Sequence, residues 1–204
     1  MMTKVALLCL IALAAGCGRA HTSENNFPQQ VRVRSPSGFS FLPPPGKEWT
    51  EKFAGCQISY SKKTDPDKVS FFAIANECKV DLQPSGQEDL IAFVSKTKDN
   101  WGTDGRFTNI STSFLPEAGN ASCVRYRMEV NDNGANNRGR HAFLLLKVVG
   151  RFCTHPDNPG PAVDMAYSIR HVPGFDASAY VAEGEAFLDT LRFEKPIDEQ
   201  SGAR

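Results

Sequence analysis

The chain has no excess of positive or negative charge. Lysine and arginine together number 23, as do aspartate and glutamate, in a sequence of 204 residues. A protein that binds nucleic acid through its phosphates is normally basic in the binding domain. The charge balance therefore argues against a nucleic-acid partner, and the length is that of one domain with short flanking segments.

The chain also lacks an apolar run long enough for a membrane-spanning helix, which needs roughly 20 residues. Its most apolar stretch follows Lys4 and ends at Gly16, after which the sequence becomes polar. A short positive start before such a run is typical of a secretory signal peptide. We therefore expect residues 1–16 to be a cleaved leader.

Sequence motifs of common enzyme and cofactor sites are absent as well. The chain contains no Gly-x-Ser-x-Gly, His-Glu-x-x-His, phosphate-loop or Cys-x-x-Cys pattern. These patterns place a nucleophile, metal ligands, backbone amides or a redox pair at the spacing that their chemistry requires. Their absence predicts a protein that is not an enzyme and that carries no cofactor.

The end of the leader carries a processing signal. The sequence Leu13-Ala14-Ala15-Gly16-Cys17 resembles the lipobox of bacterial lipoproteins, in which small residues let the signal peptidase cut just before a cysteine. Cys17 would then be the new, acylated N-terminus, and two or more acyl chains anchor a protein stably in a lipid bilayer. The alternative is a secreted protein that is cut near Gly16 and keeps Cys17 as an unmodified thiol.

The residues after Cys17 indicate location and domain limits. Gly18 stands where an aspartate typically retains such lipoproteins at the inner membrane, which favours the outer membrane of a bacterial cell envelope, with the domain in the periplasm. Residues 17–37 are rich in Asn, Gln, Ser and Pro and predict a flexible tether. We expect a single globular domain over residues 38–195 and a disordered tail over residues 196–204.

Once Cys9 of the leader and the acylated Cys17 are set aside, four cysteines remain. Their even number and the oxidising compartment expected for the domain predict disulfides. The first expected bridge lies in a hairpin. Strand-like runs over residues 55–61 and 69–76 flank a turn rich in Lys, Asp and Pro. Folding at this turn brings Cys56 opposite Cys78 within one residue, so we expect these two to be bonded.

The second expected bridge repeats the same geometry. Residues 124–130 alternate between apolar and polar side chains, residues 143–152 are mainly apolar, and the loop over residues 131–140 separates them. Folding about this loop brings Cys123 opposite Cys153. Each bridge is expected to stabilise the fold by roughly 2 to 4 kcal/mol.

Helix signals occur at two places. Ser85 and Glu88 have the spacing of a capping box, and an apolar stripe then continues to Trp101. A second stripe predicts a helix over residues 178–191. The further expected strands cover residues 39–41, 107–115 and 163–169 and the short segment at Phe193.

This order of elements predicts an α+β fold, with a mainly antiparallel sheet of about six or seven strands and two helices packed on it. Ser37–Trp49, with its Pro-Gly-x-x-Trp turn, and Phe187–Phe193 resemble the opening and closing segments of the PsbP-like α/β-sandwich family. The resemblance covers roughly residues 35–195. It implies the sandwich fold and a role as a binding or assembly factor for another envelope protein, and it supplies no active-site residue.

One loop offers an alternative function. Residues 152–161 combine His155 and Asp157 with prolines and a glycine. Together with His141 or His171, these two residues would form the metal site of a periplasmic enzyme or metal-dependent factor. The same composition is typical of a tight turn after a strand.

Two arginines offer a further possible contact. Arg125 and Arg127 occupy the polar side of an expected strand. They form either a solvated face or a patch that binds an acidic partner.

Overall fold

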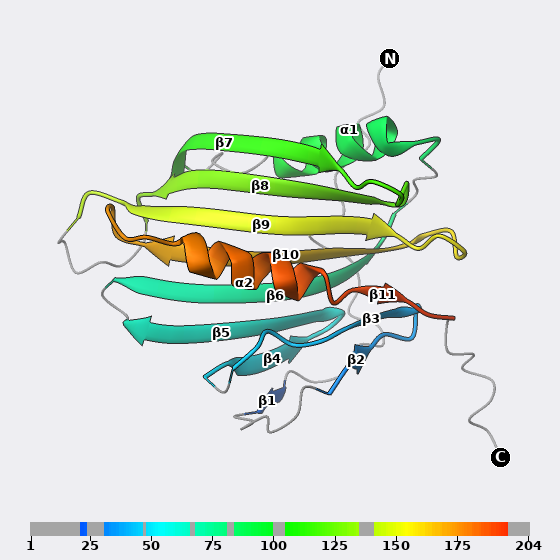
Figure 1. Cartoon of the computed structure of the whole chain (residues 1–204), viewed down its shortest axis with the longest axis horizontal. Helices are drawn as coiled ribbons and strands as arrows, with labels where there is room; N and C mark the ends of the chain where they lie inside the picture. The colour runs from blue at the N-terminus through cyan, green and yellow to red at the C-terminus, as the bar shows by residue number, and fades with distance from the viewer. Residues whose placement is uncertain are drawn as a thin grey trace.

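The computed structural model describes residues 21–23, 31–46, 48–65, 68–80, 84–99, 105–134 and 141–195. These ranges form a large antiparallel sheet, a small second sheet and two helices (Figure 1). The strands are β1 (His21–Ser23), β2 (Val33–Arg34), β3 (Phe39–Phe41), β4 (Thr50–Ala54), β5 (Gln57–Asp65), β6 (Val69–Lys79), β7 (Phe107–Pro116), β8 (Cys123–Asp132), β9 (Leu144–Thr154), β10 (Pro161–His171) and β11 (Arg192–Phe193). The helices are α1 (Gln87–Lys98) and α2 (Ser178–Leu188).

The eight-stranded sheet has the order β1-β4-β5-β6-β10-β9-β8-β7, and every neighbouring pair is antiparallel. Consecutive strands pair from β4 to β6 and again from β7 to β10. Between these runs the chain passes through α1 to the far edge, so that β10 returns to lie beside β6. The predicted α+β fold with a mainly antiparallel sheet is confirmed. The expected six or seven strands correspond to the longer ones, and β1 adds a three-residue edge.

One face of the large sheet is covered by α2 and by the second sheet, β11-β3-β2 (Figure 1). Successive residues of a strand point to opposite faces, and the odd residues of β10 from Val163 to Ile169 point to this one. None of them is more than 2% exposed. They share a core with Phe187 and Leu188 of α2 and with Phe41 of β3. We call this side the α2 face.

The other side, the α1 face, carries a second core. Leu90 and Val94 of α1 are fully buried. They pack with even-numbered residues of β8 such as Val124 and Met128. Since α1 packs mainly on β7 and β8, the part of this face that β6 and β10 form is left less covered.

The start of α1 differs in one detail from its prediction. Ser85 bonds to Asp89 and not to Glu88: its backbone N–H donates to Asp89 Oδ2 over 3.1 Å, and its hydroxyl contacts the same oxygen. The expected capping box is therefore not formed, and α1 begins at Gln87 with Gly86 as its N-cap. Trp101, at the expected end of the stripe, lies outside the described residues.

The ordered domain begins before the expected boundary at residue 38. β2 pairs with β3, and Arg32 Nη1 donates to the carbonyl oxygen of Thr190 over 2.8 Å. The hydroxyls of Ser35 and Ser37 bond to the carboxylate of Glu77. The predicted tether over residues 17–37 is therefore too long, because polar residues that composition assigned to it are held by hydrogen bonds to the domain.

Several expectations fall on other parts of the chain. The leader over residues 1–16, Cys17 and the tail over residues 196–204 lie outside the described residues. In the ranges given above, neither helix has the length and apolar character needed to span a bilayer.

Candidate functional site

The α1 face contains an open cavity of about 420 Å³ over β10. Small-molecule sites in proteins typically measure about 300 to 1,000 Å³. We call this cavity the β10 trough. Its middle is formed by Phe72, Ile74, Leu146, Val148, Ala166 and Ser168.

Strand pairing explains why the sheet is hollow at this place. In one row across the sheet, Ala166 of β10 lies between Ile74 and Gly150. In the next row, Ser168 lies between Phe72 and Val148. In each row, the residue on β10 is small and at least one of its two neighbours is large. Side chains of β6 and β9 form the walls, and β10 forms the floor.

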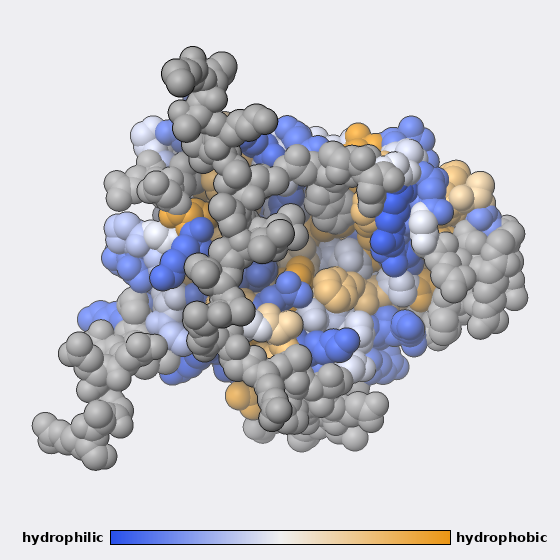
Figure 2. All heavy atoms as spheres, turned by 180° about the vertical axis from the view of Figure 1, so that it is seen from behind, coloured by the Kyte–Doolittle hydropathy of each residue, from blue (hydrophilic) through white to orange (hydrophobic). Residues whose placement is uncertain are grey.

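The surface of this face agrees with that geometry. Seen from behind, as in Figure 2, apolar surface is exposed in the middle of the face among hydrophilic residues. Phe72, which lines the trough, is 41% exposed. A large apolar side chain at the rim of a concave surface is a common feature of binding sites.

Tyr126 closes one end of the trough. It lies opposite Gly150 on β9, where an added Cβ atom would lie 2.0 Å from the Cζ atom of Tyr126. The glycine therefore lets the tyrosine ring cross β9, and its hydroxyl donates to Asp164 Oδ1 of β10 over 2.8 Å. Burial and the charge of Asp164 raise the pKa of the Tyr126 hydroxyl well above its ordinary value.

Lys98, in the last turn of α1, completes this end. Its Nζ atom lies 2.6 Å from Asp164 Oδ2 and 4.4 Å from the centre of the Tyr126 ring. Asp164 is thereby bonded to both neighbours. In this polar cluster, Lys98 and Tyr126 are the donors and the carboxylate of Asp164 is the acceptor.

A different polar group lies at the other end, around Asp132. Its side chain is 0% exposed and accepts hydrogen bonds from Arg106, over 2.8 Å at Oδ1 and 3.0 Å at Oδ2. Burial alone would raise the pKa of Asp132. The hydrogen bonds from Arg106 and the charges of Arg170 and Arg106 outweigh that effect, so its pKa lies below the ordinary value.

Arg170, which lines this end of the trough, is less well bonded. Its Nε atom lies 2.9 Å from Asp132 Oδ2, within ion-pair distance. The angle does not allow a hydrogen bond, and within the described residues this buried Nε has no other hydrogen-bond partner. Arg106 donates to both oxygens of Asp132. Of the two arginines, Arg170 is therefore the one without a hydrogen bond to this carboxylate.

The histidine loop has a structural arrangement. His155 is buried, its Nε2–H donates to the carbonyl oxygen of Glu194 over 3.0 Å, and its Nδ1 accepts from the backbone N–H of Asp157 over 3.2 Å. Its ring contacts the edges of Phe39 and Phe193. Nε2 and the ring thus help to hold the end of β11 beside β3, whereas Nδ1 fixes the loop that contains Asp157.

The proposed metal ligands are not brought together. His155 directly follows β9, and its backbone N–H donates to the carbonyl oxygen of Pro161, the first residue of β10. His171 is the last residue of β10, about 30 Å farther along at the rise of a β-strand. Over the ranges that the structure describes, no group of three or more His, Cys, Asp or Glu side chains is arranged to hold a metal ion. The alternative metal site at His155 and Asp157 therefore gains no support.

The expected disulfides differ in outcome. Cys123 and Cys153 are directly opposite in the β8–β9 pair and form a disulfide, as predicted. The structure does not join Cys56 to Cys78. The backbone N–H of Glu77 donates to the carbonyl oxygen of Cys56 over 3.1 Å, so Cys56 is opposite the residue before Cys78. A shift of one residue turns a side chain to the other face of the sheet, which explains the missing bridge.

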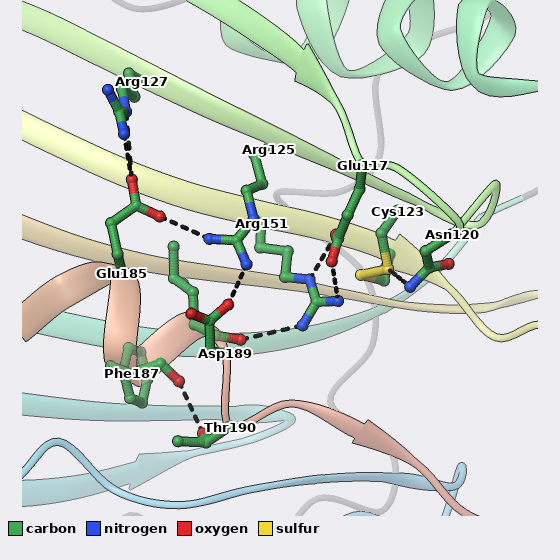
Figure 3. A network of polar contacts seen from close by, with 12 residues as sticks. Glu117, Asn120, Cys123, Arg125, Arg127, Arg151, Glu185, Phe187, Asp189 and Thr190 are labelled. Atoms are coloured by element: carbon green, nitrogen blue, oxygen red, sulfur yellow. Dashed lines mark hydrogen bonds and ion pairs between the residues drawn. A yellow bond between two sulfur atoms is a disulfide. The ribbon is translucent and has the colours of Figure 1, made fainter. Parts of the chain in front are cut away.

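Arg125 and Arg127 meet acidic residues in the last turn of α2 and at its C-cap (Figure 3). Arg125 Nη1 lies 2.6 Å from Glu185 Oε2, and its Nη2 contacts Asp189. Arg127 Nη2 lies 2.8 Å from Glu185 Oε1. The acidic partner of this arginine pair is thus the protein's own helix, and Arg151, bonded to Glu117 over 2.5 Å, extends the network.

The candidate site was not identified from the sequence. The comparisons with known protein families and with curated proteins find no match for this chain. One signal for the trough is present in β10, where large apolar residues alternate with Asp164, Ala166, Ser168 and Arg170. This alternation indicates a cavity only when the neighbouring strands are known, because those strands bring apolar residues to the same face.

Proposed function

We propose that this chain is a lipid-anchored protein of the bacterial cell envelope whose disulfide-bonded domain is a binding module. The β10 trough carries the binding part of the proposal: it is open, largely apolar and bounded by polar groups at both ends. Its size suits a small molecule or a side chain of an envelope protein partner. The sequence Leu13–Cys17 supports the lipid anchor.

The chemistry of the trough favours binding over catalysis. General acid–base and nucleophilic catalysis need a titratable group that is held ready near the reacting atoms. Lys98 and Asp164 are bonded to each other, and the raised pKa of Tyr126 keeps its hydroxyl protonated. These bonds make a rigid end wall, which supports a protein that is not an enzyme.

A PsbP-like α/β sandwich is part of the same proposal. The antiparallel sheet, with one helix on each face, supports it. In the segment that carries the resemblance, Trp49 is 3% exposed and its indole N–H donates to the carbonyl oxygen of Pro45 over 2.9 Å. This bond fixes the Pro-Gly-x-x-Trp turn at the edge of the α2-face core.

Binding at the trough is tested by photocrosslinking in living cells. A photoreactive phenylalanine analogue replaces Phe72 at the rim of the trough. The matched control carries the analogue at Phe53 of β4, which is 36% exposed, compared with 41% for Phe72. We expect a crosslinked product from position 72 and little from position 53. Equal yields at the two positions, or no product at either with a protein or with a small molecule, would contradict binding at the trough.

Anchoring is tested by replacing the acylated residue. Cys17→Ser removes the acyl acceptor and should release the protein from the membrane fraction. Cys56→Ser, at an exposed cysteine of the domain, is the matched control and should remain bound. A Cys17→Ser protein that still sediments with membranes after a high-salt wash would show that the anchor is something else.

A further inference from the structure

We infer that the β10 trough binds a small amphipathic carboxylate, with an apolar chain along β10 and the carboxylate at Arg170. The inference rests on the proposed binding function and adds the chemical class of the ligand. The middle of the trough, its two ends and the bonding of Arg170 each contribute to it.

The middle of the trough suits an apolar chain. Between Asp164 and Arg170 the floor consists of Ala166 and Ser168, and the walls include Ile74 and Val148. The hydroxyl of Ser168 donates to the backbone carbonyl oxygen of Phe72 over 3.1 Å, which uses its hydrogen bond within the protein. A ligand with polar groups along its length would lose hydrogen bonds to water here without replacing them.

The trough is elongated. Asp164 and Arg170 are separated along β10 by about 20 Å, at about 3.3 Å per residue. An unbranched chain fits this shape better than a compact ring system of similar volume. The long axis of the ligand therefore follows the strand.

The end at Arg170 suits an anion. A guanidinium carries five N–H donors and binds a carboxylate best through two parallel hydrogen bonds. Arg106 already forms such a pair with Asp132, whereas Arg170 reaches Asp132 without a hydrogen bond. The buried Nε of Arg170 faces Asp132, whereas the side chain as a whole is 33% exposed and lines the trough. A carboxylate in the trough would bond to the remaining N–H groups of Arg170.

The end at Tyr126 does not compete for the carboxylate. Lys98 is bonded to Asp164, which also accepts the hydroxyl of Tyr126. Here one cation, Lys98, faces one carboxylate. At the other end two guanidinium groups, those of Arg106 and Arg170, share the single carboxylate of Asp132. The charge distribution thus sets the direction of the ligand, with its apolar end toward the Tyr126 ring.

Laurate is a direct probe of this inference. Full-length protein carrying Cys17→Ser has no acyl chain of its own to compete, and binding is measured by isothermal titration calorimetry. Lauryl alcohol and laurylamine present the same chain with a neutral and a cationic head. We expect laurate to bind at least about tenfold more tightly than the alcohol, the gain of a charge-assisted hydrogen-bonded pair, and the amine to bind most weakly.

Two variants separate the head from the chain. Arg170→Gln should weaken laurate about tenfold and leave lauryl alcohol unchanged, and Arg106 still pairs with Asp132 in this variant. Ser168→Leu should fill the floor and weaken both ligands. The matched control is Arg127→Gln, which removes an arginine from the α2 face and should change neither affinity.

The outcomes distinguish this inference from the function on which it rests. If laurate binds no better than lauryl alcohol, or if Arg170→Gln leaves laurate unaffected, the carboxylate is not at Arg170 and the inference is wrong. If laurate fails to bind while position 72 still crosslinks to an envelope protein, the ligand class is wrong and the binding module stands. If neither is observed, both proposals fail.

Discussion

The two faces of β10 show how one strand can serve two purposes. On the α2 face its side chains are large and apolar and are buried under α2, with at most 2% of their surface exposed. On the α1 face the same strand carries small or polar side chains and lies beneath an open cavity. The contrasting residues are Val163, Met165, Tyr167 and Ile169 on the first face and Asp164, Ala166, Ser168 and Arg170 on the second.

The difference extends to the polar groups of each face. On the α2 face, polar side chains link the helix to the sheet: Lys62 and Tyr167 bond to the same carboxylate oxygen of Glu183, over 3.3 Å and 3.0 Å. On the α1 face, Arg170 has a buried donor without a hydrogen bond among the described residues. The α2 face also holds unbonded polar atoms, because the hydroxyl of Tyr60 and Nε2 of His171 have no hydrogen-bond partner among the described residues. What distinguishes Arg170 is that it lines an open cavity.

The largest expected effect is a contrast in stability between the two faces. Met165→Ala should lower the free energy of unfolding by about 2 to 5 kcal/mol, because it leaves a cavity in a closed core. Ser168→Ala, on the same strand, should change it by no more than about 0.5 kcal/mol, because the trough is already open. Urea unfolding measures both values. Similar losses in the two variants would show that the trough face is packed as a core.

A smaller effect is expected from Gly150→Ala. The added methyl group would collide with the Tyr126 ring and force it away from Asp164, at an expected cost of about 1 to 3 kcal/mol. Gly86→Ala is the matched control, since an added Cβ there meets no atom within 4 Å. Thermal unfolding of the two variants compares them. A Gly150→Ala protein as stable as the control would contradict the role of the glycine in shaping the end wall.

The smallest effect is expected in the acid stability that Asp132 provides. Its native pKa lies below the unfolded value of about 3.9. Its contribution to stability is therefore complete above that value and is lost as the pH falls through the native pKa. Asp132→Asn should lower stability at neutral pH and flatten the decline in acid, measured by urea unfolding at a series of pH values. An equally steep decline in the variant would assign the acid sensitivity to other groups.

Local patterns account for the part of the fold that the sequence predicted. The β8–β9 hairpin follows from an alternating strand, a loop of Asn, Asp and Gly and an apolar strand, and it brought Cys123 opposite Cys153. The helices follow from apolar stripes at helical spacing. The Cys56–Cys78 bridge failed on a register difference of one residue, which turn composition does not determine.

The candidate site depended on contacts between distant segments. Lys98, Tyr126 and Asp164 come from α1, β8 and β10 and meet only because β10 returns to lie beside β6. No local pattern predicts that crossover. The small residues of β10 likewise form a hollow only between larger neighbours on β6 and β9. Their alternation along β10 alone indicates an ordinary exposed strand face.

Two neighbouring valines on β9 allow the most direct test that the trough is the binding site. Val148 lines the trough, whereas Val149 belongs to the core of the α2 face. Methyl NMR spectra of the full-length Cys17→Ser protein are recorded while laurate is added. If laurate binds in the trough, the methyl signals of Val148 shift and saturate while those of Val149 stay nearly unchanged. Shifts of equal size at both residues, or at Val149 alone, would contradict it.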